Sequence, residues 1–292
     1  DSLEHVSDGA SYTYRFIASG ERRYLRLTPP GWRSVGEIDG ELAFIDHLAA
    51  KAIAVARPIA SLRSRRIESI ESAIGTCIAV VFEEIDGAAA DDDSWSEEQA
   101  REAGRLMARM HLAAYDFALP AGATRLSWRD ELRGLDGELA ASEHDLRAIV
   151  RETAELFERL PTKPEHYGMV HFDLSGDNVV WQRMEPGVID FDDCMTHWYV
   201  ADLARTVGYF RETARGRMGP YETAFMGGYR DVRRIEPEWL ELLPVFLRLA
   251  LISEFAWMNY ASQATARGVR FTAEDAANLR EIIRGLGGTT SV

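Results

Sequence analysis

The sequence reads VHFDLSGDNVVW over residues 170–181 and GVIDFDD over residues 187–193. Apolar residues lead into and out of a polar, glycine-containing loop, and a second apolar run ends in a carboxylate. This pattern predicts strand, loop, strand, a tight turn at Glu185-Pro186-Gly187, and a further strand. Such a hairpin would hold its polar loop rigidly, so the rest of the chain can be read outward from it.

Several oxygen-bearing side chains fall in or beside this predicted hairpin, and three of them matter for a metal ion. They belong to Asp173, Asn178 and Asp190, and the strand geometry would bring them to the same end of the strands. Two carboxylates and an amide suit Mg²⁺, which prefers hard oxygen ligands and is usually shared between one or two protein groups and substrate phosphates. The residues alone therefore predict a magnesium site.

Length and composition are those of an ordinary soluble protein. The 292 residues are enough for two lobes or two small domains, and the apolar fraction of 46% is typical of a globular chain. No apolar run approaches the about 20 residues that span a bilayer, and no signal peptide is visible in a chain that starts at Asp1. Cys77 and Cys194 lie far apart in the sequence, which argues against a zinc site or a disulfide framework and predicts a cytoplasmic protein.

The net charge of −14 bears on the partners of the protein. An acidic chain is a poor match for nucleic-acid phosphates, so neither a nucleic-acid partner nor a membrane partner is expected. Acidity is compatible with a cationic substrate, although solubility is the more common reason for such a charge. The sequence gives no indication of the oligomeric state.

The first part of the chain is predicted to be rich in strands. Residues 5–28 are predicted to form strands, since Tyr12, Tyr14 and Phe16 alternate with polar residues. Before them, the small segment Ser7-Asp8-Gly9-Ala10-Ser11 could let backbone N–H groups approach phosphates. Apolar residues at helical spacing predict a helix over residues 36–50, and further strands are predicted between residues 52 and 82.

The composition changes after residue 86. Ala88 to Asp93 is small and acidic, which is typical of a linker. Beyond it the chain is predicted to be mainly helical, with helices from residue 97 and over 127–160, 200–212, 219–231, 237–261 and 273–286. The sequence thus predicts an α+β fold of two lobes, a small β-rich lobe at 1–86 and a larger, mainly helical lobe at 87–292, with a ligand cleft between them.

The spacing His171-x-Asp173-x-x-x-x-Asn178, followed by Ile189-Asp190, resembles the catalytic and metal loops of the protein-kinase-like superfamily. It looks most like the branch of aminoglycoside phosphotransferases and choline kinases, in which a His-x-Asp loop replaces the His-Arg-Asp loop of protein kinases. The acidic and aromatic residues after Asp190 make it look nearer to the homoserine-kinase-type and spore-coat-kinase-like members. The resemblance covers nearly the whole chain and implies a small-molecule kinase.

The resemblance implies roles for residues of the larger lobe. Asp173 is expected to accept a hydrogen bond from the substrate hydroxyl and to take its proton during transfer. Asn178 and Asp190 would hold Mg²⁺ at the phosphates of ATP, with GTP also possible. His171 is expected to support the loop. Asp202 is expected to cap backbone N–H groups of the catalytic loop, or else to be an ordinary helix-start Asp.

In the smaller lobe, the resemblance points to residues that would bind the nucleotide. Arg26 stands where protein kinases have Lys, and Glu41 on the following helix would pair with it. Tyr24 should face the same way as Arg26, since side chains alternate along a strand, and could pack on the base. The other expected contacts are Ser7 and Gly9 in the small segment, and Glu83 and Ile85 at the linker, where backbone groups usually bind adenine.

The sequence says least about which molecule accepts the phosphoryl group. Asp192, Asp193 and Trp198 could form a pocket for an amine-bearing alcohol, or Trp198 could simply pack the hairpin on the next helix. No extended segment separates Asp190 from the helix near residue 200, which favours a small acceptor over a peptide. Aminoglycosides, choline-like and homoserine-like alcohols and sugars all stay open. A catalytically weak or inactive nucleotide-binding relative and a protein Ser/Thr kinase are the alternatives.

Overall fold

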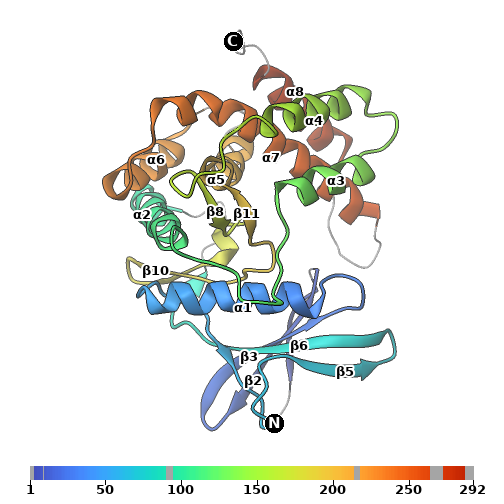
Figure 1. Ribbon diagram of the computed structural model, residues 1–292, viewed down its shortest axis with the longest axis vertical. Helices are drawn as coiled ribbons and strands as arrows, with labels where there is room; N and C mark the ends of the chain where they lie inside the picture. Colours follow the sequence, from blue (N-terminus) through green and yellow to red (C-terminus); the bar gives the residue numbers. More distant parts are fainter. Residues whose placement is uncertain (1–2, 9, 90–94, 214–217, 264–271, 287–292) are drawn as a thin grey trace.

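The computed structural model has two lobes, with most strands in the lower lobe and most helices in the upper lobe of Figure 1. It describes residues 3–8, 10–89, 95–213, 218–263 and 272–286. The order of the elements agrees with the predicted two-lobed α+β fold. The lobe boundary between residues 86 and 87 stays a prediction.

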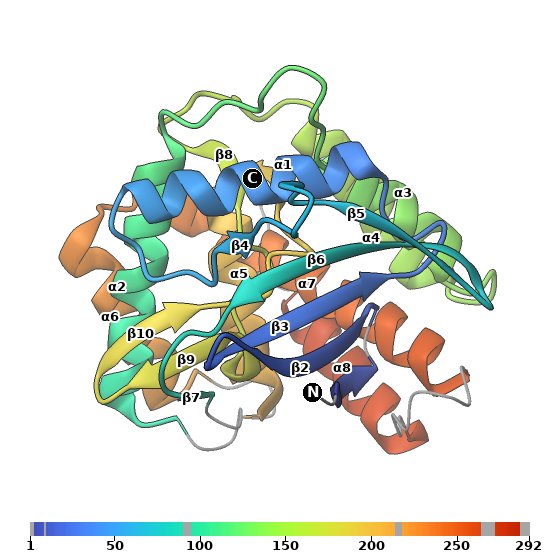
Figure 2. The same cartoon turned by 90° about the horizontal axis from the view of Figure 1, so that it is seen from below.

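The smaller lobe is built on an antiparallel sheet whose path runs β1-β2-β3-β6-β4, with β5 paired to β6. Its strands are β1 (Glu4–Asp8), β2 (Tyr12–Ala18), β3 (Glu21–Thr28), β4 (Pro58–Ile59), β5 (Glu68–Ser72) and β6 (Gly75–Glu83). Helix α1 (Val35–Ala50) lies across the sheet on the side of the larger lobe (Figures 1 and 2). The predicted strands over 5–28 and the predicted helix over 36–50 are confirmed.

Helix α1 begins at a capping box. The side chain of Ser34 accepts from the N–H of Glu37, and the side chain of Glu37 accepts from the N–H of Ser34. Its apolar residues recur every three or four positions and are fully buried: Ile38, Leu42, Ile45 and Leu48. Glu41 shares this buried face, so its charge requires a partner inside the lobe.

The larger lobe is mainly helical, and every predicted helical stretch contains helix. The helices are α2 (Glu97–Ala114), α3 (Trp128–Glu138), α4 (His144–Phe157), α5 (Tyr199–Thr213), α6 (Pro220–Val232), α7 (Pro237–Gln263) and α8 (Ala273–Gly285). Helix α2 packs on α6, and α5 packs on α7 and touches two strands of the predicted hairpin region. None of the helices in the described ranges is long and apolar enough to cross a bilayer.

The predicted hairpin is present, but its turn lies elsewhere. Strands β9 (Val179–Gln182) and β10 (Glu185–Val188) pair directly, so Arg183 and Met184 make the turn, with Arg183 at φ 59°. The predicted turn at residues 185–187 is therefore wrong. Strand β10 lies at the edge of its sheet, where proline is tolerated because no ladder bond needs its missing N–H.

A second strand pair, β8 (Tyr167–Val170) and β11 (Met195–Trp198), flanks this hairpin in sequence. The polar loop between β8 and β9, here called the catalytic loop, ends in a 3₁₀ turn over Gly176–Asn178. The segment of residues 189–194 between β10 and β11 is here called the metal loop. Both loops start and end on paired strands, which fix the positions of their ends.

The connection between the lobes is partly a strand rather than a linker. Strand β7 (Ala88–Ala89) pairs with β9, while residues 90–93 of the predicted linker lie outside the described part of the chain. Gly87 has φ 138°, and a Cβ there would stand 2.4 Å from the carbonyl oxygen of Trp181. Glycine permits both this backbone conformation and this close approach, which fasten the connection to the larger lobe.

Helix α1 is also fastened to the larger lobe. The N–H of Thr124 donates to the carbonyl of Gly36 at 2.9 Å, and Arg125 donates to the carbonyl of Glu37 at 3.2 Å. A Cβ on Gly40 would stand only 2.3 Å from the carbonyl oxygen of Thr124, so this contact requires glycine. Helix α1 is thus held by the sheet on one side and by the segment before α3 on the other.

Candidate active site

The catalytic loop and the metal loop each contain a residue in an unusual backbone conformation. Phe172 has φ 69° and Asp190 has φ 57°, both in the left-handed region that residues other than glycine seldom adopt. Such conformations raise the energy, persist only where the surroundings fix them, and cluster at functional sites. The contacts around these two loops therefore show what the fold holds in place.

The carboxylate of Asp202, near the start of α5, holds the backbone of the catalytic loop. It accepts from the N–H of His171 at 3.2 Å and from the N–H of Phe172 at 2.8 Å. Burial opposes ionisation of this side chain, but hydrogen bonds from His111 and the loop outweigh it and hold the pKa of Asp202 below its ordinary value. This is the arrangement that the resemblance implies for Asp202.

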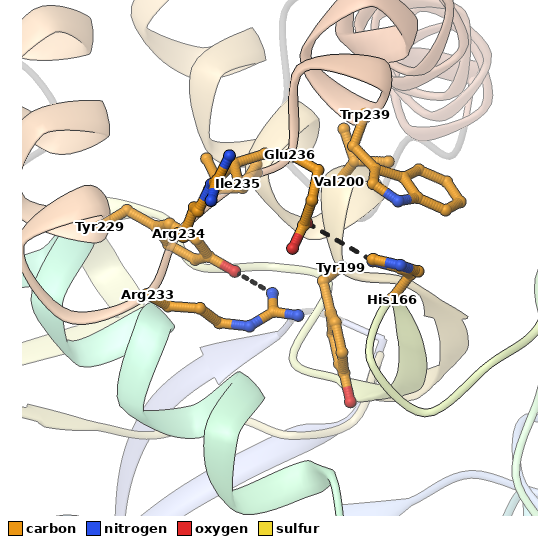
Figure 3. A pocket seen from close by; sticks show the side chains of 10 residues that line it. His166, Tyr199, Val200, Tyr229, Arg233, Arg234, Ile235, Glu236 and Trp239 are labelled. Atoms are coloured by element: carbon orange, nitrogen blue, oxygen red, sulfur yellow. Dashed lines mark hydrogen bonds and ion pairs between the residues drawn. The ribbon is translucent and has the colours of Figure 1, made fainter.

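A directed chain of hydrogen bonds continues from Asp202 to the surface. Arg233 can only donate, and it donates to the phenol oxygen of Tyr229 at 2.6 Å (Figure 3). The phenol hydrogen of Tyr229 therefore goes to Nδ1 of His111 at 2.8 Å, and the Nε2–H of His111 donates to Asp202 at 2.9 Å. Burial lowers the pKa of His111, which agrees with a neutral ring that carries one proton.

His171 joins the two loops. Its Nδ1 accepts from the N–H of Asp173 at 3.2 Å, so the neutral ring carries its proton on Nε2 and donates it to the carbonyl of Ile189 at 3.0 Å. Burial lowers the pKa of His171 and keeps the ring neutral at pH 7. With both nitrogens engaged by the backbone, His171 is placed to support the loops and not to act as a base.

The carboxylate of Asp173 is held by two donors, one on each oxygen. The amide of Asn178 donates to Oδ2 at 2.8 Å, and the phenol of Tyr209 donates to Oδ1 at 2.5 Å. Burial and the negative charge of Asp193 raise the pKa of Asp173 to about 7, while Arg205 opposes the rise. A carboxyl group whose pKa is close to neutral pH is well suited to accept a proton during a reaction.

Asn178 and Asp190, the predicted metal ligands, lie on segments that are joined through the backbone. The N–H of Ile189 donates to the carbonyl of Asn178 at 3.0 Å. Because the NH₂ of Asn178 faces Asp173, its amide oxygen is the atom left for a cation. Within the described ranges no cluster of three or more His, Cys, Asp or Glu could hold a metal ion. A cation here would therefore need phosphate oxygens to complete its shell, as Mg²⁺ usually does.

The carboxylate of Asp190 is the most exposed of the predicted catalytic and metal groups, at 55% for its side chain. The protein atoms around it nonetheless raise its pKa to about 6; Arg26 opposes this rise, and Asp192 and Asp193 add to it. Since solvent reaches this carboxyl group, the direction of the shift matters more than its size. A divalent cation would relieve the repulsion among these carboxylates.

Arg26 and Glu41 form a buried, bidentate ion pair, with N–O distances of 2.8 and 2.6 Å. The Arg26 guanidinium also lies 4.0 Å from Asp190 and 3.9 Å from Asp192. Its single charge therefore faces three carboxylates, of which Glu41 binds it most closely. The pair predicted from the resemblance is present, and it places Arg26 against the metal loop.

Asp192 and Asp193, two of the predicted acceptor contacts, are paired with the smaller lobe. Trp32 donates to Asp192 at 2.8 Å, and Arg33 lies 3.2 Å from Asp192 and 2.8 Å from Asp193. Asp192 is 8% exposed, so its charge links the lobes and is not open to a cationic acceptor. The side chain of Asp193 is 47% exposed and lies close enough to Asp173 to raise its pKa, so its acceptor role stays a prediction.

Trp198 does not line a substrate pocket. Its side chain is fully buried among Trp128, Phe157 and Phe246, and its Nε1–H donates to the carbonyl of Pro161 at 2.8 Å. The predicted substrate contact at Trp198 is wrong, and the alternative of packing is correct. An aromatic residue after a polar loop has the same sequence signature in both roles, so only its burial separates them.

Two of the expected nucleotide contacts lie beside the connection between the lobes. The hydroxyl of Tyr24 on β3 is 3.4 Å from the carboxylate of Glu84. The N–H of Glu83 donates to the carbonyl of Arg57 at 2.9 Å. An adenine contact by Glu83 would therefore use its carbonyl and not its N–H.

The remaining expected nucleotide contacts are Ile85, Ser7 and Gly9. Ile85 packs against β10, where a Cβ added to Gly187 would stand 3.0 Å from Cγ2 of Ile85. Ser7 belongs to strand β1 rather than to an open loop, and the register of β1 shifts next to it. Gly9 lies outside the described residues. The fold therefore gives Ser7 a defined backbone pairing that the sequence did not suggest.

Several residues that shape the site were not predicted from the sequence. Arg125, in the segment before α3, donates to the carbonyls of Cys194 and Asp192 in the metal loop. The others are Trp32, Arg33, Arg205 and Tyr209. Arg205 and Tyr209 follow Asp202 by three and seven positions, a spacing that puts them on one face of the helix and could have identified them.

Figure 3 shows a pocket between α5, α6 and the start of α7. Its wall includes the Arg233–Tyr229 pair and an ion pair between His166 and Glu236 at 3.7 Å. None of the predicted catalytic or metal-binding residues lines it. The pocket is therefore not the candidate active site.

Comparisons with known proteins agree with this geometry. A family model described as the phosphotransferase enzyme family matches residues 2–241. Amicoumacin kinase of Bacillus subtilis (strain 168) is 28% identical over 261 residues, which cover 85% of this chain and 77% of that protein. Homoserine kinase of Neisseria meningitidis serogroup B (strain ATCC BAA-335 / MC58) is 28% identical over 255 residues, which cover 86% and 80%.

Among solved structures, the chain is similar to amicoumacin kinase hAmiN in complex with AMP-PNP, Ca²⁺ and Ami. The TM-score is 0.85 at 22% identity, and the match covers 99% of this chain and 88% of that chain. This likeness confirms the predicted two-lobed, protein-kinase-like fold.

Proposed function

The chain belongs to the phosphotransferase enzyme family, and on that premise we propose that it uses ATP and Mg²⁺ to phosphorylate a hydroxyl group of an amine-bearing small molecule. Its membership confirms the predicted resemblance to aminoglycoside phosphotransferases and choline kinases, and makes the protein a phosphotransferase with a small-molecule hydroxyl as acceptor. The finer parts of the proposal are the nucleotide, the metal and the amine.

One observation carries the proposal: the carboxylate of Asp173 is joined to Asn178 by a hydrogen bond of 2.8 Å, and the charge of Asp190 lies close enough to help raise its pKa. In the proposed reaction the acceptor oxygen forms a bond to the γ-phosphorus and the bond to the β–γ bridging oxygen breaks. ADP leaves, and the hydroxyl proton passes to Asp173. Asn178 and Asp190 would hold Mg²⁺, whose charge offsets that of the phosphates.

The proposed nucleotide site adjoins the metal loop from the smaller lobe. Arg26, fixed by Glu41 and 4.0 Å from Asp190, supplies positive charge there. The nucleotide contacts of Tyr24, Glu83, Ile85, Ser7 and Gly9 are part of this proposal. The solved amicoumacin kinase complex contains an ATP analogue and a divalent cation, which supports ATP and a metal for this chain.

The amine in the proposed acceptor is supported by charge and by the relatives. Asp193 is half-exposed beside Asp173 and offers a carboxylate to an ammonium group. The overall charge of −14 also favours a cationic ligand. One curated relative is named for homoserine, an alcohol that carries an amine.

The test is a coupled ADP-release screen of the purified protein with ATP and with GTP. The acceptors are aminoglycosides, amicoumacin, homoserine-like and choline-like alcohols, and sugars without an amine. Phosphorus NMR then identifies the new phosphate ester. Turnover with one or more amine-bearing alcohols supports the proposal, and turnover confined to amine-free sugars contradicts the amine. No transfer to any alcohol contradicts the kinase activity itself.

The two alternatives have less support. An inactive nucleotide-binding relative would be expected to lack Asp173, Asn178 or Asp190, and all three are present. A protein kinase would be expected to present a platform for a peptide after the metal ligand. Here residues 189–194 alone separate β10 from β11, which favours a small acceptor.

A further inference from the structure

Four side chains on one face of α5 hold the catalytic loop. Three of them are Asp202, Arg205 and Thr206, and the fourth, Tyr209, lies seven positions after Asp202. Residues that are three, four and seven positions apart lie on the same side of an α-helix. This row of four side chains is called the α5 row below.

Each member of the α5 row contacts a different group of the catalytic loop. Besides the two N–H groups bound by Asp202, Nε of Arg205 donates to the carbonyl of Phe172 at 3.2 Å. The hydroxyl of Thr206 donates to the carbonyl of Leu174 at 3.1 Å. Phe172, with its left-handed φ of 69°, is thus held at both its N–H and its carbonyl. One helix face therefore fixes the backbone on both sides of Asp173.

Tyr209 is the member of the row that contacts the reacting group itself. Its phenol donates to Oδ1 of Asp173 at 2.5 Å. We propose that Tyr209 is a positioning residue, which together with Asn178 fixes the plane of the Asp173 carboxylate toward the acceptor hydroxyl. The inference rests on the proposed function, because it assigns a role to Tyr209 in that same transfer.

The geometry explains why two donors are needed. A carboxylate bound at one oxygen can still turn about the bond to its Cβ, whereas one donor on each oxygen removes that freedom. Tyr209 holds Oδ1 and Asn178 holds Oδ2. Each carboxylate oxygen can accept two hydrogen bonds, so the acceptor hydroxyl still finds a free lone pair. Tyr209 therefore orients the carboxylate without blocking it.

The surroundings keep the phenol of Tyr209 a donor. Its pKa lies well above the ordinary value, because burial and the charge of Asp173 outweigh the opposing effect of Arg205. The Arg205 guanidinium packs over the rings of Phe172 and Tyr209, at 5.2 and 5.9 Å from their centroids. The hydroxyl of Tyr209 thus carries its proton at neutral pH and is held by packing on its ring.

The test compares Tyr209→Phe with Tyr199→Phe on the same helix. Tyr199 is also buried, but its phenol oxygen has no hydrogen-bond partner among the described residues and lies against Gly168 of β8. We expect Tyr209→Phe to lower kcat by about 10- to 100-fold, the scale of a misaligned reacting group, with the KM for ATP within about twofold of wild type. Tyr199→Phe should leave both constants unchanged.

Each other outcome overturns the inference. An unchanged kcat in Tyr209→Phe, or a loss shared equally with Tyr199→Phe, would make the phenol a packing group. A higher kcat, or faster ATP hydrolysis without acceptor, would make Tyr209 a block on Asp173.

If the wild-type protein phosphorylates no alcohol, the proposed function fails, and crystal structures then decide the role of Tyr209. Several Asp173 carboxylate orientations in Tyr209→Phe, against a single one in wild type and in Tyr199→Phe, support positioning. A single orientation in all three proteins contradicts it.

Discussion

The catalytic loop and the metal loop are joined through His171, yet different parts of the chain hold them. The α5 row, within the larger lobe, fixes the catalytic loop. The metal loop is bound instead by Arg26 and Trp32–Arg33 of the smaller lobe and by Arg125 of the segment before α3. The backbone around the proposed base is therefore fixed within one lobe, whereas the metal loop is fixed by the contact between lobes.

Because the two loops are held differently, substitutions near them should impair the enzyme in two different ways. A change in the α5 row should disturb proton transfer and leave the binding of Mg²⁺ and nucleotide intact. A change at the contact between lobes should weaken the binding of Mg²⁺ and spare the chemical step. Each prediction below tests one side of that division.

The largest effect is expected at the base itself. Asp173→Asn should lower kcat by about 10²–10⁴-fold, the usual scale for loss of a general base, while the affinity for ATP measured by calorimetry is retained. Asp190→Asn is the matched comparison, since it should lose Mg²⁺-dependent nucleotide binding as well. Wild-type turnover in Asp173→Asn would remove Asp173 from its proposed role.

The contact between lobes should control the metal requirement. Arg33 is nearly buried and holds both Asp192 and Asp193. We expect Arg33→Ala to raise the Mg²⁺ concentration for half-maximal activity by about tenfold, the lower end for loss of a contact around a metal site, with a smaller change in kcat. Arg129→Ala, which removes an exposed ion pair to Glu158, serves as the control and should change neither value. The same Mg²⁺ requirement in wild type and Arg33→Ala would contradict the inference that contacts between the lobes support Mg²⁺ binding.

The pH dependence should come from Asp173. Burial raises its pKa to about 7, so the group is protonated and inactive as a base below that value and ionised above it. We expect kcat/KM to fall about tenfold for each pH unit below the pKa of Asp173, which forms the acidic limb of the pH profile. Bound Mg²⁺ should move the limb to lower pH, because a nearby positive charge favours the carboxylate. A profile that is flat between pH 5 and pH 8 would contradict the assignment.

The smallest effect is expected on stability. Burial lowers the pKa of both His111 and His171, so between those values and about pH 6.5 the unfolded chain binds protons that the folded protein does not. Stability is therefore complete above about pH 6.5 and falls as the pH decreases, by at most about 1.4 kcal/mol per pH unit for each histidine. We expect Tm to drop between pH 7.5 and pH 5.5, and His144→Gln, at an exposed position, to leave that drop unchanged. An equal Tm at both pH values would contradict the inference that the rings of His111 and His171 are neutral in the folded protein.

The sequence predicted what depends on local pattern. The apolar spacing identified the helices within a few residues, and the spacing of Asp173, Asn178 and Asp190 identified the two loops. The turn was misplaced because Pro186 and Gly187 have the composition of a turn, and only the position of β10 at a sheet edge allows them in a strand.

Contacts between distant segments escaped prediction. Arg33 meets Asp193 across 160 residues, and Tyr209 meets Asp173 across 36. Neither pair has a signature in the sequence around it, because a surface arginine and a helix tyrosine are common residues. The prediction of a substrate contact at Trp198 was wrong for a different reason. An aromatic residue beside a polar loop suggests a pocket whether or not the residue is buried.

The attachment of α1 on two sides has a consequence for nucleotide exchange. Gly36 and Gly40 bind α1 to the segment at Thr124, while Glu41 binds the same helix to β3 through Arg26. A rotation of one lobe away from the other about Gly87 would have to break either the contact of α1 with the segment at Thr124 or its contact with β3. In the proposed reaction, ATP would then enter and ADP would leave by local movement of β1 and β2, at the edge of the sheet far from β4. The rate of product release would then be set by a hairpin and not by the separation of two domains.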